Sequence, residues 1–272
     1  MLISRKFVLL SMPKTASTFT RSATKEALTE AGEPFEELLF TNMFNSHRPA
    51  DQHGAYAQIP SGARGRSVVS VARDPYDKFL STFKYRYWAN YPPITASEIA
   101  AFLPTFPRLT LDQYVLMNLL SDRRKVTVCR TGIAAQTVQF IRMYASDPVR
   151  VLAELSQGCD LADVVAAMGA VRMLRAEHIA DELADFLLEV GLPDAAAQRC
   201  RTRPRENVQE EAAPNLTDAA RRYVTHNDSW LFDLLTAFQL EVPKRTEGPP
   251  GVVTLEHFGV PADHPLLLAA RN

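Results

Sequence analysis

Near the start of the chain, the hydrophobic pattern predicts a strand, a polar loop and a helix in succession. Phe7 to Leu10 is a short apolar run between polar residues, as in a strand buried within a parallel sheet. Ser11 to Thr18 is rich in hydroxyl side chains. From Thr18 to Ala31 apolar residues recur every three or four positions, which predicts a helix ended by Gly32. This order directs backbone N–H groups and the positive end of a helix dipole at one point, which suits a phosphate or sulfate.

A second strand, loop and helix follow further along the chain. Ser67 to Ala72 is an apolar run rich in valine and predicts a strand. Arg73 follows it directly, and Asp74 and Pro75 are favourable as the cap and the first residue of a helix. This helix is expected to bury one apolar side, formed by Phe79, Leu80, Phe83, Tyr87 and Trp88.

The rest of the chain continues the alternation of strands and helices. Further strands are expected at 35–41, 125–129 and 170–174, and helices at 111–120, 134–144, 149–155, 178–190, 217–225 and 228–239. Residues 91–109 are rich in proline and are expected to be irregular. The pattern predicts a three-layer α/β fold with a central, mostly parallel sheet flanked by helices. We expect one domain over residues 1–240, with a proline-rich extension, 241–272, packed on or draped over it.

Composition narrows the class of protein. The 272 residues are 46% hydrophobic and 22% charged, which is enough for one large domain. The net charge of −1 gives no overall basic field, so a nucleic acid polymer is not expected as a partner. Cys129, Cys159 and Cys200 are odd in number and form no C-x-x-C, so we expect neither a disulfide framework nor a metal site. No apolar run has the length of a signal peptide or a membrane span, which favours a cytoplasmic location. The oligomeric state is left open.

The first polar loop carries candidate anion-binding chemistry. Lys14 supplies a mobile positive charge, and Thr15, Ser17 and Thr18 supply hydroxyl groups. The alternative interpretation is a plain strand-to-helix connection in which Ser17 or Thr18 caps the helix. A Walker loop needs early glycines and a late lysine, whereas here the first glycine is Gly32.

Three further groups are candidates for contact with a ligand. Arg73 ends a predicted strand and Ser81 follows eight residues later, so the two side chains can hold one phosphate from two directions. A loop after the second predicted strand carries His47, Asp51 and His53, at the edge of the sheet where ligands bind in open α/β proteins. A polar stretch carries four alternating arginines, which would all point one way on an extended chain. The stretch is either a solvated loop or an electropositive wall that faces an anionic ligand. Its arginines are Arg199, Arg201, Arg203 and Arg205.

Two of these stretches resemble the nucleotide signatures of one enzyme family. The sequence Ser11-Met-Pro-Lys-Thr-Ala-Ser-Thr-Phe19 resembles the 5′-phosphosulfate loop of sulfotransferases that use 3′-phosphoadenosine 5′-phosphosulfate (PAPS). Residues 71–83 resemble the 3′-phosphate signature of that family, an arginine and a proline followed by the serine at position 81. The run 78–87 and the C-terminal stretch 215–232 are most similar to the carbohydrate-type branch. The chain departs from the family at Ala16, where the loop usually has glycine, and its usual C-terminal nucleotide contact is not found; the alternating arginines are a candidate replacement.

The resemblance implies a P-loop-NTPase-like sulfotransferase fold and transfer of a sulfuryl group from PAPS to an acceptor hydroxyl, without a metal. The acceptor would be a carbohydrate or another small molecule. Lys14 would stabilise the charge on the departing phosphate, and His47 would act as the base, with Asp51 or His53 in its place as alternatives. The nucleotide would be held by Pro13, Lys14, Thr15, Ala16, Ser17, Thr18, Phe19, Arg73 and Ser81. The alternatives are a P-loop-type kinase or nucleotidase, with Asp74 as its candidate metal ligand, and a nucleotide-binding module without catalysis.

Overall fold

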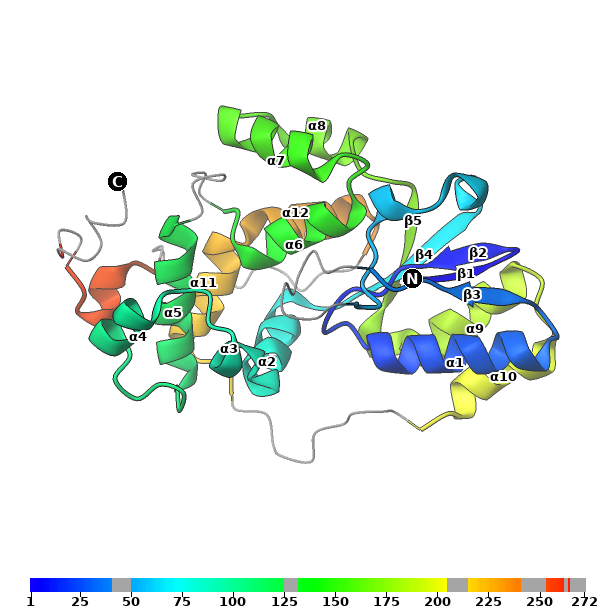
Figure 1. The fold of residues 1–272 in the computed structure, drawn as a ribbon, viewed down its shortest axis with the longest axis horizontal. Helices are drawn as coiled ribbons and strands as arrows, with labels where there is room; N and C mark the ends of the chain where they lie inside the picture. The colour runs from blue at the N-terminus through cyan, green and yellow to red at the C-terminus, as the bar shows by residue number, and fades with distance from the viewer. Residues whose placement is uncertain (41–49, 125–131, 205–214, 241–252, 262–263, 265–272) are drawn as a thin grey trace.

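The computed structural model of the chain describes residues 1–40, 50–124, 132–204, 215–240, 253–261 and 264. It is elongated, with a sheet at one end and a group of helices at the other (Figure 1). The strands are β1 (Leu2–Ser4), β2 (Phe7–Leu9), β3 (Phe35–Glu37), β4 (Ser67–Ala72) and β5 (Val171–Arg175). The strands predicted at 7–10, 67–72 and 170–174 are confirmed, and the one predicted at 35–41 is shortened to β3. The strand predicted at 125–129 lies outside the described residues.

The sheet is mixed, with the order β3-β1-β2-β4-β5. β4 pairs in parallel with β2 and with β5, whereas β1 is antiparallel to both β2 and β3. The prediction of a mostly parallel sheet is therefore wrong. The cause is β1, a three-residue strand that turns directly back into β2, where Ser4 Oγ accepts hydrogen bonds from the N–H groups of Lys6 and Phe7. So short a strand has no hydrophobic periodicity by which the sequence could reveal it.

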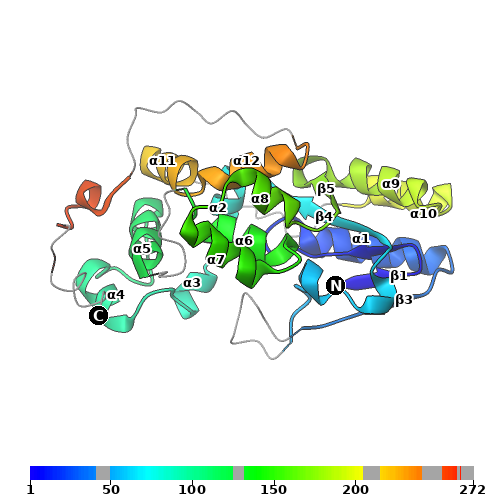
Figure 2. The same cartoon turned by 90° about the horizontal axis from the view of Figure 1, so that it is seen from above.

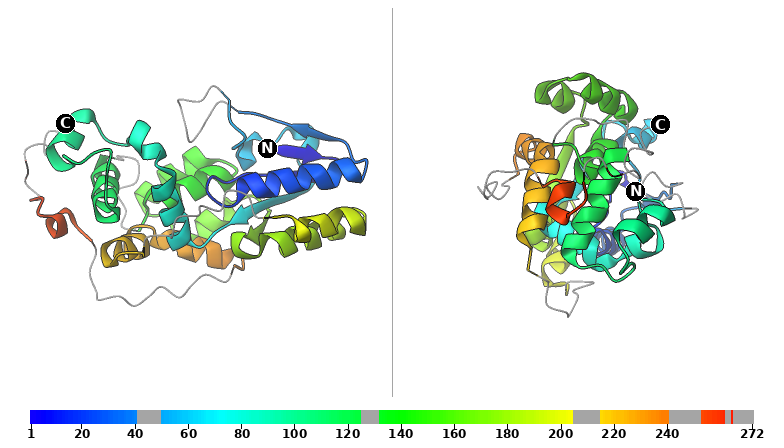
Figure 3. Two further views of the ribbon diagram at one scale, coloured as in Figure 1. Left: turned by 90° about the horizontal axis from the view of Figure 1, so that it is seen from below. Right: turned by 90° about the vertical axis from the view of Figure 1, so that its left-hand side faces the viewer.

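Helices cover both faces of the sheet, as expected for a three-layer arrangement (Figure 3). Phe7 and Leu9 point to one face, which packs against α1 (Ser17–Glu30), α9 (Ile179–Glu189) and α10 (Asp194–Thr202). Val8 and Leu10 point to the other face. That face is covered by α6 (Ala135–Tyr144), α7 (Pro148–Gln157), α8 (Leu161–Ala166) and α12 (Ser229–Ala237).

A buried polar contact joins the two central strands inside this core. Ser70 of β4 donates a hydrogen bond to the carbonyl of Leu10 (2.9 Å), and its Oγ lies 2.8 Å from the hydroxyl of Tyr144 on α6. Ser70 and Tyr144 are fully buried. The contact therefore fixes the end of β2, from which the hydroxyl-rich loop begins.

A second group of helices lies beyond the end of the sheet at which α1 begins (Figures 1 and 2). It contains α2 (Pro75–Tyr85), α3 (Tyr87–Asn90), α4 (Ala96–Phe102), α5 (Leu111–Arg124) and α11 (Asp218–Asn227). Its core is aromatic, and Phe79, Trp88, Tyr114, Tyr223 and Phe232 are buried in it. Short 3-10 turns complete the described structure: η1 (Tyr56–Gln58), η2 (Ser61–Ala63), η3 (Ala176–His178) and η4 (Leu255–Phe258). None of the helices in the described part of the chain is long and apolar enough to cross a membrane.

Three sequence expectations about the helices are corrected. Residues 91–109 are not wholly irregular, because Thr95 and Glu98 form a capping box that begins α4. Tyr87 and Trp88 do not continue α2, because Arg86 adopts a left-handed conformation that ends it. The alternating arginines are not an extended wall, because the chain is helical (α10) up to Thr202.

The described arginines of that stretch are paired with acidic residues. Arg199 Nε lies 2.6 Å from Glu30 of α1, and Arg203 pairs with Glu26 of the same helix. Arg201 pairs with Asp185 of α9. These ion pairs link α10 and Arg203, the residue after it, to α1 and α9; Arg205 lies outside the described residues.

Candidate active site

The loop between β2 and α1 is tightly wound. Lys14 and Ala16 both have a positive φ, 65° and 57°, in the left-handed region that an L-residue enters at a cost of about 1–2 kcal/mol. Thr15 is buried, and its hydroxyl donates to the carbonyl of Met12 at 3.0 Å, so its side chain holds the loop and is not free to donate to an anion. Ala16 stands where the similar family has glycine. Ala16 therefore adopts a conformation that favours glycine, although it carries a side chain.

The start of α1 offers uncapped N–H groups. Ala16 is the N-cap residue and forms no side-chain cap, and the first turn has no acidic residue. The interpretation in which Ser17 or Thr18 caps the helix is therefore wrong. The first N–H groups of a helix lack intrahelical partners and carry its positive end, so this terminus suits an anion. Phe19 contributes only its backbone there, because its side chain is buried against the sheet.

Lys14 lies in the loop after β2 and Arg73 directly follows β4, and these two strands are adjacent and parallel. The pKa of Lys14 is lowered to about 8, first by partial burial and then by repulsion from Arg73. The Lys14 ammonium lies 3.8 Å from the centre of the Tyr85 ring on α2. The structure thus brings the two predicted anion-binding segments together, and the overall views show the loop before α1 beside α2 (Figures 1, 2 and 3).

α2 turns a polar face toward this loop. Lys78, Ser81 and Tyr85 share one face of the helix, opposite the apolar face of Tyr76 and Phe79. Because Tyr85 contacts Lys14, the half-buried Ser81 one turn earlier is on the side of the loop. The predicted clamp of Arg73 and Ser81 is therefore compatible with the fold.

Asp74 is a structural residue of this helix. Its Oδ1 accepts hydrogen bonds from the N–H groups of Tyr76 and Asp77, at 2.8 and 2.9 Å, which confirms the predicted N-cap. Burial raises the pKa of Asp74. In the kinase alternative, a metal would have to bind the same carboxylate that already caps α2. Among the described residues, no three His, Cys, Asp or Glu side chains gather as metal ligands.

His53 is held against the start of the loop. Its Nδ1 donates to the carbonyl of Ser11 at 2.5 Å, and its Nε2 lies 3.5 Å from Oδ1 of Asp51. Both side chains are largely buried, and burial lowers the pKa of His53, which favours the neutral ring. Nε2 can then accept a proton, with Asp51 alongside to stabilise the imidazolium. His47 lies outside the described residues.

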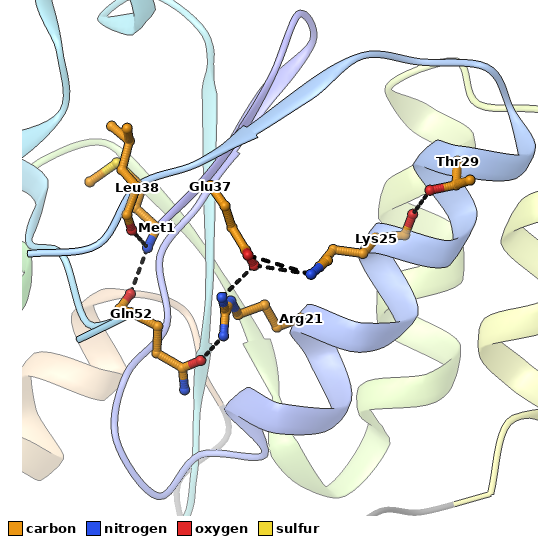
Figure 4. A network of polar contacts seen from close by, with 7 residues as sticks. All are labelled: Met1, Arg21, Lys25, Thr29, Glu37, Leu38 and Gln52. Carbon is orange, nitrogen blue, oxygen red and sulfur yellow. Dashed lines mark hydrogen bonds and ion pairs between the residues drawn. The ribbon is translucent and has the colours of Figure 1, made fainter. Parts of the chain in front are cut away.

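A polar network holds the segment of His53 against α1 (Figure 4). Arg21 of α1 contacts both the side chain of Gln52 and Glu37 of β3. Lys25, one turn later, lies 3.4 Å from Glu37, and the amine of Met1 donates to the carbonyl of Gln52 at 2.6 Å. These contacts fix residues 51–53 relative to the N-terminus of α1.

Two residues of the site were not singled out from the sequence. Tyr85 is not among the residues expected on the buried side of its helix, and its contact with Lys14 joins positions far apart in the chain. Lys78 is 4% exposed and, within the described structure, forms no ion pair. Burial lowers its pKa to about 8, although Asp228 attracts it. Asp228 is itself buried, and it accepts hydrogen bonds from the N–H and hydroxyl of Thr137. Hydrophobic periodicity carries no signal for a buried charge.

Comparison of the chain with protein-family models, with curated proteins and with solved structures gives no match. The functional argument therefore depends on the two sequence motifs and on the geometry described above.

Proposed function

We propose that the chain is a sulfotransferase that moves a sulfuryl group from PAPS to an acceptor hydroxyl. The observation that carries this proposal is the convergence of three features at the ends of β2 and β4. These features are the uncapped start of α1, the ammonium of Lys14 and the guanidinium of Arg73. Two positive side chains beside a helix N-terminus suit a ligand with more than one anionic group.

The donor would be gripped at its two ends. The N–H groups at the start of α1 and the hydroxyls of Ser17 and Thr18 face the 5′-phosphosulfate. Pro13, Thr15, Ala16 and Phe19 shape the loop. Arg73 and Ser81 hold the 3′-phosphate, which fixes the nucleotide for attack in line with the breaking bond.

The chemistry assigns a role to Lys14 and to a base. The acceptor oxygen forms a bond to sulfur while the bond from sulfur to the phosphate oxygen breaks, and the acceptor proton passes to the base. Lys14, largely charged at pH 7, stabilises the negative charge that develops on the phosphate. Among the described residues His53 is the best placed base, because it is fixed to Ser11 and supported by Asp51. His47 remains a prediction for the same role.

The proposal is tested by incubating the chain with labelled PAPS and a cell extract and identifying what carries the label. We expect a labelled small molecule or carbohydrate, and loss of transfer in Lys14→Met by at least about a hundredfold with the fold intact. Lys6→Met is the matched control and should transfer normally, because this exposed lysine lies in the turn between β1 and β2, at the opposite end of β2 from the loop. Unchanged transfer in Lys14→Met would refute the mechanism. Magnesium-dependent binding of ATP, with no binding of the desulfated product 3′-phosphoadenosine 5′-phosphate (PAP), would instead favour a kinase.

A further inference from the structure

Lys14 lies against an aromatic ring and not against a carboxylate. Its ammonium is 3.8 Å from the centre of the Tyr85 ring, well within the range of about 6 Å for a cation–π contact. Among the described residues, no acidic side chain forms an ion pair with Lys14. Arg73, the charged group that acts on Lys14, is also positive and repels it.

Tyr85 is itself held in place by its neighbours. It is the last residue of α2, and the left-handed Arg86 (φ 55°) then starts the short helix α3. The Tyr85 ring stacks on Tyr87, with centroids 6.5 Å apart and planes 14° apart, and Tyr87 lies 4.7 Å from Tyr91. Tyr85 is 50% exposed, so this row of rings lies at the surface with Lys14 at one end.

An aromatic ring and a carboxylate would have different consequences for an anionic ligand. A carboxylate would cancel the charge of Lys14 and would repel the ligand. A ring attracts the ammonium through its quadrupole and leaves the full positive charge in place. An arriving anion binds the ammonium more strongly than the ring does. It can therefore replace the ring as the partner of Lys14, and no ion pair has to be broken.

We propose that Tyr85 is a positioning residue for Lys14, which holds the ammonium charged and aimed along α2 until an anion engages it. That Tyr85 keeps the Lys14 ammonium in place is argued from the contact alone. The effect of Tyr85 on turnover rests on the proposed function, and the experiment separates these two parts.

The interaction of Tyr85 with Lys14 is measured through the pKa of the Lys14 amine. The full-length chain is acetylated with acetic anhydride between pH 6.5 and 10, and the Lys14 peptide is quantified by mass spectrometry. Only the neutral amine reacts, so the midpoint of the rate profile reports its pKa, which is about 8 in the native chain. Tyr85→Phe keeps the ring, Tyr85→Leu removes it but keeps apolar bulk, and Tyr91→Leu removes another exposed ring of the row.

We expect Tyr85→Leu to lower the midpoint by roughly half a pH unit, because the charged form loses its aromatic partner. Tyr85→Phe and Tyr91→Leu should leave it unchanged. A native midpoint in Tyr85→Leu, or an equal shift in Tyr85→Phe, would overturn the proposal. Tyr85→Met provides the same comparison if Tyr85→Leu does not fold.

Turnover gives the second measurement. With Lys14 less well placed, Tyr85→Leu should transfer about tenfold more slowly while its affinity for PAP stays within about threefold, and Tyr85→Phe should restore the rate. An equal rate in Tyr85→Leu would overturn a positioning role in catalysis. If the native chain transfers no label from PAPS, the proposed function fails, and the amine titration still decides whether Tyr85 holds Lys14.

Discussion

The lowered pKa of Lys14 makes nucleotide binding depend on pH in a range where ordinary lysines do not titrate. With a pKa of about 8, Lys14 is about nine-tenths charged at pH 7 and about one-tenth charged at pH 9. Only the charged form attracts a phosphate, so affinity falls as pH rises. The expected loss of affinity for PAP between pH 7 and 9 is about tenfold, or ~1.4 kcal/mol. A lysine at the ordinary value of 10.5 would give a flat profile.

The assay is calorimetric titration of the chain with PAP at pH 7, 8 and 9 and constant ionic strength. The phosphate groups of PAP do not contribute, because their second ionisation, near pH 6, is largely complete over this range. Buffers of different ionisation enthalpy should reveal proton uptake on binding at pH 9, because the bound phosphate raises the pKa of Lys14.

Two variants identify the titrating group. Lys14→Arg keeps its charge at every pH tested, so its profile should be flat. Lys14→Met should also be flat, but with weaker binding throughout. A flat profile in the native chain would refute the reasoning about Lys14. A tenfold fall that persists in Lys14→Arg would assign the titration to another group, for which the buried Lys78 is the candidate.

Three further predictions concern stability and are measured by urea unfolding. Ala16→Gly should leave stability unchanged or raise it by up to about 1 kcal/mol, because glycine adopts the left-handed conformation freely. Ala27→Gly, in the interior of the same helix, should instead cost at least about 1 kcal/mol. Tyr144→Phe should cost about 1 kcal/mol, because it removes the buried hydroxyl that meets Ser70; no loss would show that the contact is not formed. Lys78→Met should stabilise the chain at pH 5 by up to roughly 3 kcal/mol. The lysine is neutral in both the folded and the unfolded chain above pH 10.5, so it costs no folding free energy there. As the pH falls through about 8 the buried amine must take up a proton, and at pH 5 the full cost of burying the charge lowers the stability of the native chain. Destabilisation by Lys78→Met at pH 5 would refute the assignment of a buried charge that forms no ion pair with the residues described in the structure.

Part of the site follows from local sequence. Asp74 caps α2 as predicted, because a carboxylate before Pro75 can accept the first N–H groups of the helix whatever lies around it. The strand, loop and helix at residues 7–31 form as expected for the same reason, since apolar spacing and Gly32 act within a few residues. The side-chain roles in the loop were not predictable in this way. Thr15 was expected to donate to the ligand, but its hydroxyl instead closes the turn through Met12.

The sequence by itself determined many of the strands and helices, among them β2, β4 and α1, and placed Lys14 in the loop after β2 and Arg73 directly after β4. These properties depend on neighbours within one or two turns. Tertiary structure alone decided that β1 makes the sheet mixed, that Arg201 pairs with α9, and that Lys14 meets Tyr85. Those outcomes are contacts between distant segments, and burial sets their charges and pKa values. Hydrophobic periodicity reveals which side of an element is buried, but it does not reveal which distant segment that side contacts or that a charged side chain is buried.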